Sequence, residues 1–182
     1  MSMKKTMCTL LVGLGVSGVL NTALAATNPE VSVLYRGNLV AEPCTLLPED
    51  ENIQLDFGTV IDKYLYLNGR TNSKPFQLRL IDCDTSLGKT VKMTFSGTES
   101  IELPGLLALD GGSEAKGVAI GLETEGGQAL ALNQQSRGHE ITDGNNTITL
   151  QAYVKGEPEA IANKAIVRGM FTAVATFALE YE

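Results

Sequence analysis

The sequence predicts an all-β sandwich, and three observations support this prediction. Short apolar runs recur along the chain between clusters of glycine, asparagine and aspartate, a spacing typical of sandwich strands. The only stretch with helix-like composition is 157–164, and Pro158 near its start limits that helix to a turn or two. A long pattern of period two lies near each end of the chain. We find no internal repeat, linker or second domain between them.

Residues 1–25 have the features of a cleaved export signal. Lys4 and Lys5 form a positive start, 7–20 is an apolar run, and Ala-Leu-Ala at 23–25 matches a signal-peptidase site. The apolar run is shorter than the roughly 20 residues that span a bilayer, so a signal peptide is expected rather than a membrane anchor. We therefore interpret 26–182 as the mature protein.

The mature chain is acidic. The signal removes two lysines and no carboxylate, so the formal net charge changes from −7 for the full sequence to −9. Such a charge argues against nucleic acid and anionic membrane surfaces as partners.

The first expected strand is 31–40, where apolar and more polar residues alternate and which Pro43 terminates. Its first set of alternate residues is Val31, Val33, Tyr35, Gly37 and Leu39.

Two cysteines, Cys44 and Cys83, remain in the mature chain. A single pair in an exported domain is most simply one disulfide, since neither the spacing nor further ligands suit a redox motif or a metal. Closing a loop of 39 residues restricts the unfolded chain by about 4 kcal/mol.

The middle of the chain supplies the further strands of the sandwich. Between the cysteines, 62–74 is expected to be a turn-rich connection. The alternating or apolar runs that we expect to form strands are 53–57, 76–80, 91–95, 106–109, 118–122, 129–132 and 148–154.

The last expected strand is 169–182, and it is long and apolar on one face. That face carries Gly169, Phe171, Ala173, Ala175, Phe177, Leu179 and Tyr181. An exposed apolar strand edge either aggregates or pairs with a foreign strand. The strand at 31–40 of a neighbouring molecule can fill this edge, and such head-to-tail contacts generate an open fibre.

Signals of enzyme chemistry are weak. His139 is the only histidine and lies in a polar turn, which indicates a surface residue rather than a base or a zinc ligand. The acidic groups 49–51 and Glu123/Glu125 are interpreted as solvated loop charges rather than as a general acid and base. We expect no enzyme activity, no metal and no cofactor.

Four motifs together resemble the chaperone–usher pilus subunits, or fimbrial pilins, with the greatest similarity to minor or adaptor subunits of P-pilus-type fibres. The motifs cover essentially the whole mature chain. They are the extension 31–39, Pro43-Cys44-Thr45 with its partner Cys83, Leu55-Asp56-Phe57-Gly58, and the C-terminal signature from Gly169 to the penultimate Tyr181.

The resemblance implies an incomplete immunoglobulin-like sandwich that lacks its last strand and is completed by donor-strand exchange. A periplasmic chaperone first lends a strand to the groove beside the C-terminal strand and anchors the carboxylate of Glu182. At the outer-membrane usher, the extension of the next subunit replaces that strand. On this basis 26–40 is the donor extension and 41–182 the pilin body. Val33, Tyr35, Gly37 and Leu39 enter a neighbour's groove, with Gly37 at a shallow part of it.

The expected function is that of a structural subunit of a surface pilus that supports cell adhesion, exported through the periplasm. Its expected partners are the chaperone, the usher and neighbouring subunits, without membrane insertion. Two alternatives stay open: a complete exported sandwich that binds a small ligand, in which 31–39 pairs within its own molecule, and a major rod subunit.

Overall fold

The computed structural model describes residues 32–39 and 41–182. The expected signal peptide, together with Val31, lies outside the described residues. The chain divides into two units, 1–38 and 39–182, and each is considered by itself. Among the described residues, no helix has the length and apolar character needed to cross a membrane.

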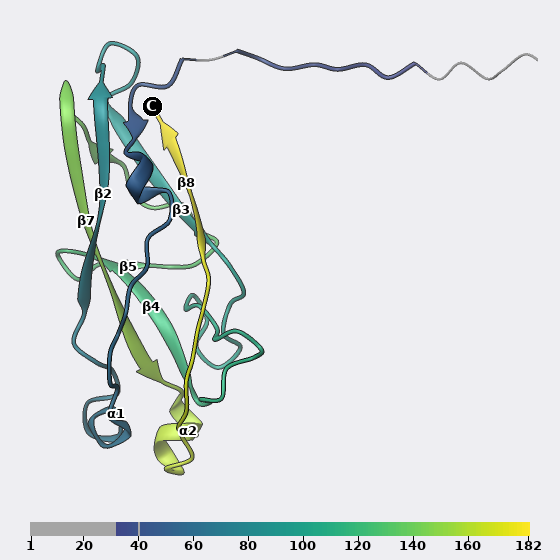
Figure 1. Cartoon of the computed structure of the whole chain (residues 1–182), viewed down its shortest axis with the longest axis vertical. Helices are drawn as coiled ribbons and strands as arrows, with labels where there is room; N and C mark the ends of the chain where they lie inside the picture. The colour runs from purple at the N-terminus through teal and green to yellow at the C-terminus, as the bar shows by residue number, and fades with distance from the viewer. Residues whose placement is uncertain (1–31, 40) are drawn as a thin grey trace, which may run out of the picture. The chain divides into compact units, whose positions relative to one another are not determined.

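The body is built from two antiparallel sheets (Figure 1). In one, five strands lie in the order β1 (Thr45–Leu46), β2 (Lys74–Cys83), β7 (Gly144–Gly156), β4 (Val118–Thr124) and β5 (Ala129–Leu130). In the other, three strands lie in the order β6 (His139–Glu140), β3 (Thr90–Ser96) and β8 (Thr176–Tyr181). Short helices are η1 (Pro48–Asp50), α1 (Asp62–Asn68) and α2 (Pro158–Ala162).

The core forms where alternate side chains of both sheets meet. Leu78 and Leu80 of β2 are fully buried, and they join Val91 and Met93 of β3 in one apolar cluster. The predicted disulfide between Cys44 and Cys83 is present and lies within this cluster. It ties the start of the body to the last residue of β2.

The predicted all-β sandwich is confirmed, with strands over 76–80, 91–95, 118–122 and 148–154 and a short helix at α2. The expectation of a turn-rich connection at 62–74 is partly wrong, because α1 occupies its first half. No side chain caps α1, but Leu65 is buried and Gly69 ends the helix with a φ of +75°. Tertiary burial therefore stabilises a helix that its local sequence does not predict.

Two other expected strands, 53–57 and 106–109, are not strands. Leu107 makes only isolated bridges, and 53–57 makes no backbone–backbone hydrogen bond within the described chain. In both segments apolar side chains still face the core, as the alternation of apolar and polar residues predicts. The alternation does not predict whether another strand pairs with the segment.

The strand expected at 31–40 is also absent from 32–39. Every residue of 32–39 is exposed, including Tyr35 at 87% and Leu39 at 103%. A strand is defined by its ladder, and this segment has none in the isolated chain.

An open groove as the candidate functional site

The C-terminal segment presents two different faces. Its odd-numbered residues from Phe171 to Tyr181 are half-buried and pack against the main core, whereas its even-numbered residues from Thr172 to Glu182 are exposed. The pattern continues through 171–175, although only Thr176–Tyr181 forms a strand. The predicted apolar face is therefore present, but none of its side chains is fully covered.

The same odd-numbered residues carry the unpaired backbone. Thr90 and Glu182 exchange both backbone hydrogen bonds, with N···O distances of 3.0 and 2.9 Å. Along an antiparallel ladder, residues that exchange backbone hydrogen bonds alternate with residues that do not. The backbone N–H and C=O groups of the even-numbered residues of β8 therefore point towards β3, and those of the odd-numbered residues point away from it. On that side β8 is the edge of its sheet.

In the segment that precedes β8, even-numbered residues likewise make backbone hydrogen bonds and odd-numbered residues do not. The carbonyl oxygens of Met170 and Thr172 accept bonds from Glu114 and Asp110, at 2.9 and 2.8 Å. Among the described residues, Phe171, Ala173 and Ala175 have no backbone–backbone bond. Side-chain exposure and missing hydrogen bonds thus coincide on one set of residues.

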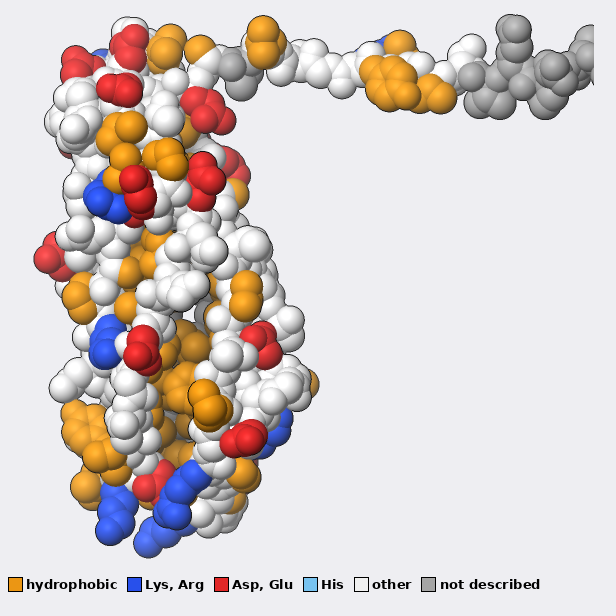
Figure 2. Space-filling view, viewed as in Figure 1, with side chains coloured by type: hydrophobic (Ala, Val, Ile, Leu, Met, Phe, Trp, Pro, Cys, Tyr) orange, Lys and Arg blue, Asp and Glu red, His pale blue; other side chains and the backbone are white. Residues whose placement is uncertain are grey.

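The opposite wall is the segment 53–57. Ile53, Leu55 and Phe57 are half-buried against the core and alternate with exposed neighbours. The two walls approach at one end, where the ring centroids of Phe57 and Phe171 are 6.2 Å apart. We name the space between 53–57 and 171–181 the open groove. Figure 2 shows apolar side chains along a hollow on this face.

Aromatic side chains continue from the wall into the core. The ring of Phe177 lies 6.1 Å from that of Phe95 on β3, and Phe95 meets Phe76 of β2 edge to face at 6.4 Å. The groove is therefore a direct opening into the space between the sheets. The body has the form of a sandwich from which one strand is missing.

The groove has two distinct ends. At the helix end, Phe171 packs on the small cluster around Leu65 of α1. At the other end, near the disulfide, a Cβ added at Gly88 would lie 2.9 Å from Cγ of Pro43 and 3.5 Å from Cβ of Tyr181. Burial, and then the charge of Glu42, raises the pKa of the Tyr181 hydroxyl. The C-terminal carboxylate of Glu182 accepts hydrogen bonds from the backbone N–H groups of Lys89 and Thr90 at 2.7 and 3.0 Å, and Nζ of Lys92 donates to the side-chain carboxylate of Glu182 at 2.5 Å.

Gly169 comes two residues before Phe171, the first residue of the groove wall. Its φ is +151°, and an added Cβ would lie 2.4 Å from the Cβ of Glu114. The residue allows the chain to turn tightly from the loop after α2 into the groove wall, a conformation that other residues rarely adopt.

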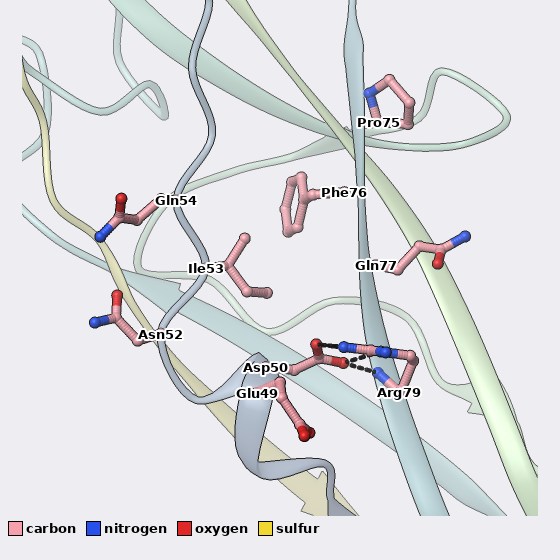
Figure 3. Close-up of a pocket in the computed structure, with 9 residues that line it drawn as sticks. All are labelled: Glu49, Asp50, Asn52, Ile53, Gln54, Pro75, Phe76, Gln77 and Arg79. Atoms are coloured by element: carbon pink, nitrogen blue, oxygen red, sulfur yellow. Dashed lines mark hydrogen bonds and ion pairs between the residues drawn. The ribbon is translucent and has the colours of Figure 1, made fainter.

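A side cavity separates the wall 53–57 from β2. The cavity has a volume of about 430 Å³. Figure 3 shows the side chains of Ile53 and Phe76 facing each other across it. The gap exists because the first strand, β1, pairs with β2 at Thr45 and Leu46, makes one more backbone hydrogen bond from Leu47 to Arg79, and then leaves β2. Neither edge of 53–57 therefore has a partner strand in the described body.

Asp50, interpreted above as a solvated loop charge, is buried at one corner of this cavity. The backbone N–H of Arg79 and its Nε donate to Oδ2 of Asp50 at 2.7 and 2.9 Å (Figure 3). Arg79, chiefly through side-chain hydrogen bonds, holds the pKa of the Asp50 carboxyl below its ordinary value. The sequence interpretation of this residue is wrong, because its partner arrives from β2.

Glu123 was likewise expected to be solvated and is buried. Arg70 binds both of its oxygens, at 3.0 and 2.8 Å, and lies 3.5 Å above the ring of Tyr153. Arg70, with Ser73, lowers the pKa of Glu123. Gly121 admits the Tyr153 ring, since a Cβ there would lie 2.2 Å from Cζ.

The proposed donor residues Val33, Tyr35, Gly37 and Leu39 all lie in the exposed segment 32–39. The wall 53–57 was not predicted as part of the site, although its alternation ahead of Gly58 was the available signal. His139 is exposed, and in the part of the chain that the structure describes no three His, Cys, Asp or Glu residues are grouped as metal ligands.

Comparison with known proteins gives consistent matches. Residues 33–182 match the family model described as "Fimbrial protein". The chain is 38% identical to the "Major MR/P fimbria protein" of Proteus mirabilis (strain HI4320), over 99% of this chain and 100% of that protein. It is 35% identical to "Fimbrial adapter PapK" of Escherichia coli, over 82% of this chain and 86% of that protein.

Among solved structures, the fold is similar to that described as "Crystal structure of the P pilus rod subunit PapA". The TM-score is 0.67 and the identity 25%, and the match covers 78% of this chain and 100% of that one.

Proposed function

The chain belongs to the fimbrial protein family, and we propose that it joins its neighbours by donor-strand exchange through the open groove. As a fimbrial subunit of the chaperone–usher type, it is a structural protein of the cell-surface fimbria rather than an enzyme. Its fold is an immunoglobulin-like sandwich that lacks a strand, and neighbouring subunits are its partners.

One observation carries the proposal. The odd-numbered residues from Phe171 to Tyr181 combine half-buried apolar side chains with backbone groups that face an empty edge. An added strand supplies both missing elements at once, because its side chains alternate at the same period and its backbone pairs. Gly169 marks the start of this wall.

The donor is the extension of a neighbouring subunit, with Val33, Tyr35, Gly37 and Leu39 directed into the groove. Val33, Tyr35 and Leu39 are 66%, 87% and 103% exposed, so nearly all of their apolar surface is available for burial. At roughly 1.5–3 kcal/mol each, the three side chains contribute on the order of 5–9 kcal/mol. That is comparable with the whole stability of an ordinary domain.

This proposal divides the chain into a signal peptide at 1–25, a donor extension at 26–40 and a pilin body at 41–182. Before assembly, a periplasmic chaperone occupies the groove and binds the C-terminal carboxylate of Glu182. An outer-membrane usher then provides the place of exchange. The half-exposed core explains why such a body needs a chaperone, because an open apolar edge promotes aggregation.

Within the fimbria, we assign the chain a minor or adaptor role, which the 35% identity to PapK supports. A major rod subunit is the second candidate. It is favoured by the 38% identity to the major MR/P protein and by the similarity to the PapA rod subunit. The two roles differ in one measurable property, since a rod subunit must accept its own extension whereas an adaptor joins unlike subunits.

The test uses hydrogen exchange on the body 41–182, with and without a peptide of residues 31–39. In the free body, the amides of Phe171 to Tyr181 should alternate between fast exchange at odd positions and slow exchange at even positions of β8. Peptide binding should slow the odd set, and it would favour the rod role. Protection of both sets in a free, monomeric body contradicts donor-strand exchange.

A further inference from the structure

The two ends of the groove carry different surfaces. The helix end has three exposed apolar side chains in or beside α1, Ile61, Tyr64 and Leu67, of which Leu67 is 85% exposed. Lys63 lies among them and is exposed. Figure 2 shows apolar and basic side chains gathered at the end of the body where α1 and α2 lie.

Charge at the helix end favours an acidic partner. Arg168 pairs with Asp62 at 2.6 Å, so that carboxylate is already compensated. Glu159 of α2 is an exposed negative charge whose hydrogen-bond partner Asn163 is neutral, so one of the two free cations named next offsets it. Lys63 and Lys164 are exposed cations, and neither takes part in an ion pair among the described residues.

The disulfide end is acidic. Its exposed carboxylates surround the point where the body begins, and Lys89 is the exposed cation beside them. The backbone of Asp84 donates to Pro43 at 2.8 Å, and Asp143 binds the Thr85 side chain at 2.7 Å. Figure 2 shows Asp and Glu side chains at this end. The exposed carboxylates without an ion pair in the described body are Glu42, Asp82, Asp84 and Asp143, whereas the side chain of Glu182 is paired with Lys92 at 2.5 Å.

Strand direction brings these two surfaces together. The missing strand of an immunoglobulin-like sandwich is antiparallel to the one before it, here β8. A donor strand therefore runs from Tyr181 towards Phe171, so its Leu39 lies towards the acceptor's helix end. Only four residues lead from Leu39 to Pro43, a reach of about 14 Å at most. The donor's disulfide end must then face the acceptor's helix end.

We propose that the helix end, formed by Ile61, Lys63, Tyr64 and Leu67, is a docking surface for the acidic disulfide end of a second copy of this chain. The contact is separate from the groove but continuous with it, and the inference rests on donor-strand exchange between copies of this chain, as in the second candidate role given above. The apolar side chains of α1 are covered by the neighbouring body, and Lys63 meets its carboxylates. The docked bodies steer the extension towards the groove, because complementary charges raise association rates.

The test follows the mature chain as it assembles after release from denaturant, by the formation of oligomers that survive SDS. The variants are Lys63→Glu, Glu42→Lys, both together, and Leu67→Ser. Glu125→Lys on the β4–β5 hairpin is the matched control for charge. All sites are exposed, and an acidic residue in the first turn of α1 suits the helix dipole, so each variant should fold.

Each single variant should slow assembly by about two- to fivefold, the effect of one exposed charge contact, and the pair should restore the rate. The control variant Glu125→Lys should assemble at the unaltered rate. Salt at roughly 0.5 M should reduce the differences in assembly rate between the charge variants and the unaltered chain. If the single variants assemble at the unaltered rate, or if the double variant is slowed by the sum of the two single effects, the docking surface is overturned. SDS-resistant oligomers would in that case still support donor-strand exchange. Absence of such oligomers even from the unaltered chain overturns a second copy as the occupant.

Discussion

Covalent addition of the donor strand should greatly stabilise the body. The comparison is between residues 41–182 alone and the same body followed by a flexible linker and a copy of 31–39 after Glu182. In the second chain, Val33, Tyr35 and Leu39 can bury surface that is now 66%, 87% and 103% exposed. The half-buried odd-numbered residues from Phe171 to Tyr181 gain a cover as well.

The expected shift follows from this burial. The three donor side chains contribute on the order of 5–9 kcal/mol, before the new backbone hydrogen bonds are counted. For a domain of this size, about 3 °C per kcal/mol gives a rise in the unfolding midpoint of about 15–30 °C. Closing the linker loop reduces the gain slightly, since its entropic cost rises only slowly with length.

The assay is thermal unfolding followed by circular dichroism, at several protein concentrations so that dimers are recognised. The control is the same fusion with Val33→Asp and Tyr35→Asp, which keeps the length of the chain but places charge in the apolar groove. Its midpoint should match that of the body alone. Equal midpoints for all three chains would mean that the body is complete without a donor, and donor-strand exchange would be refuted.

Three further predictions concern the body. Replacing both Cys44 and Cys83 with serine should lower the unfolding free energy by about 2–5 kcal/mol, measured by denaturant titration, and no loss would mean that the bridge does not constrain the chain. Gly121→Ala should cost about 1–3 kcal/mol in the same titration, because its Cβ overlaps the Tyr153 ring; an unchanged midpoint would contradict that packing. The Arg70 contact lowers the pKa of Glu123 from 4.5, so its stabilisation is present above that pH and is lost as the pH falls through the folded-state value. As the pH is lowered from about 5 to 3, the free energy of unfolding should therefore fall less for Glu123→Gln than for the unaltered body. If the two curves of unfolding free energy against pH are parallel, groups other than Glu123 cause the acid sensitivity.

The sequence predicted which way side chains face better than it predicted which strands pair. Period two at 171–181 identified the apolar face of the groove wall, because alternate residues of an extended chain point to the same side. The same pattern at 53–57 was assigned to a strand, yet that segment has no backbone–backbone partner in the described body. Pairing depends on which other segment arrives alongside, and alternation does not contain that information.

The buried carboxylates could not be predicted for a related reason. Asp50 and Glu123 resemble solvated charges locally, and their partners Arg79 and Arg70 lie 29 and 53 residues away in the sequence. Only the folded topology brings each pair together. The helix α1 is a similar case, since burial of Leu65 rather than a capping residue stabilises it.

In the groove wall, the same residues have incompletely covered apolar side chains and unpaired backbone groups. This combination also favours a strand over a small molecule as the occupant of the groove. A small apolar ligand can cover the side chains of Phe171, Phe177 and Leu179, but it leaves the backbone groups of the same residues facing an unpaired edge. Each buried donor or acceptor without a partner costs about 1–3 kcal/mol, which would offset much of the gain from covering those side chains. A strand satisfies side chain and backbone together, residue by residue. An extended peptide is therefore the one class of occupant that the geometry of this groove favours along its whole length.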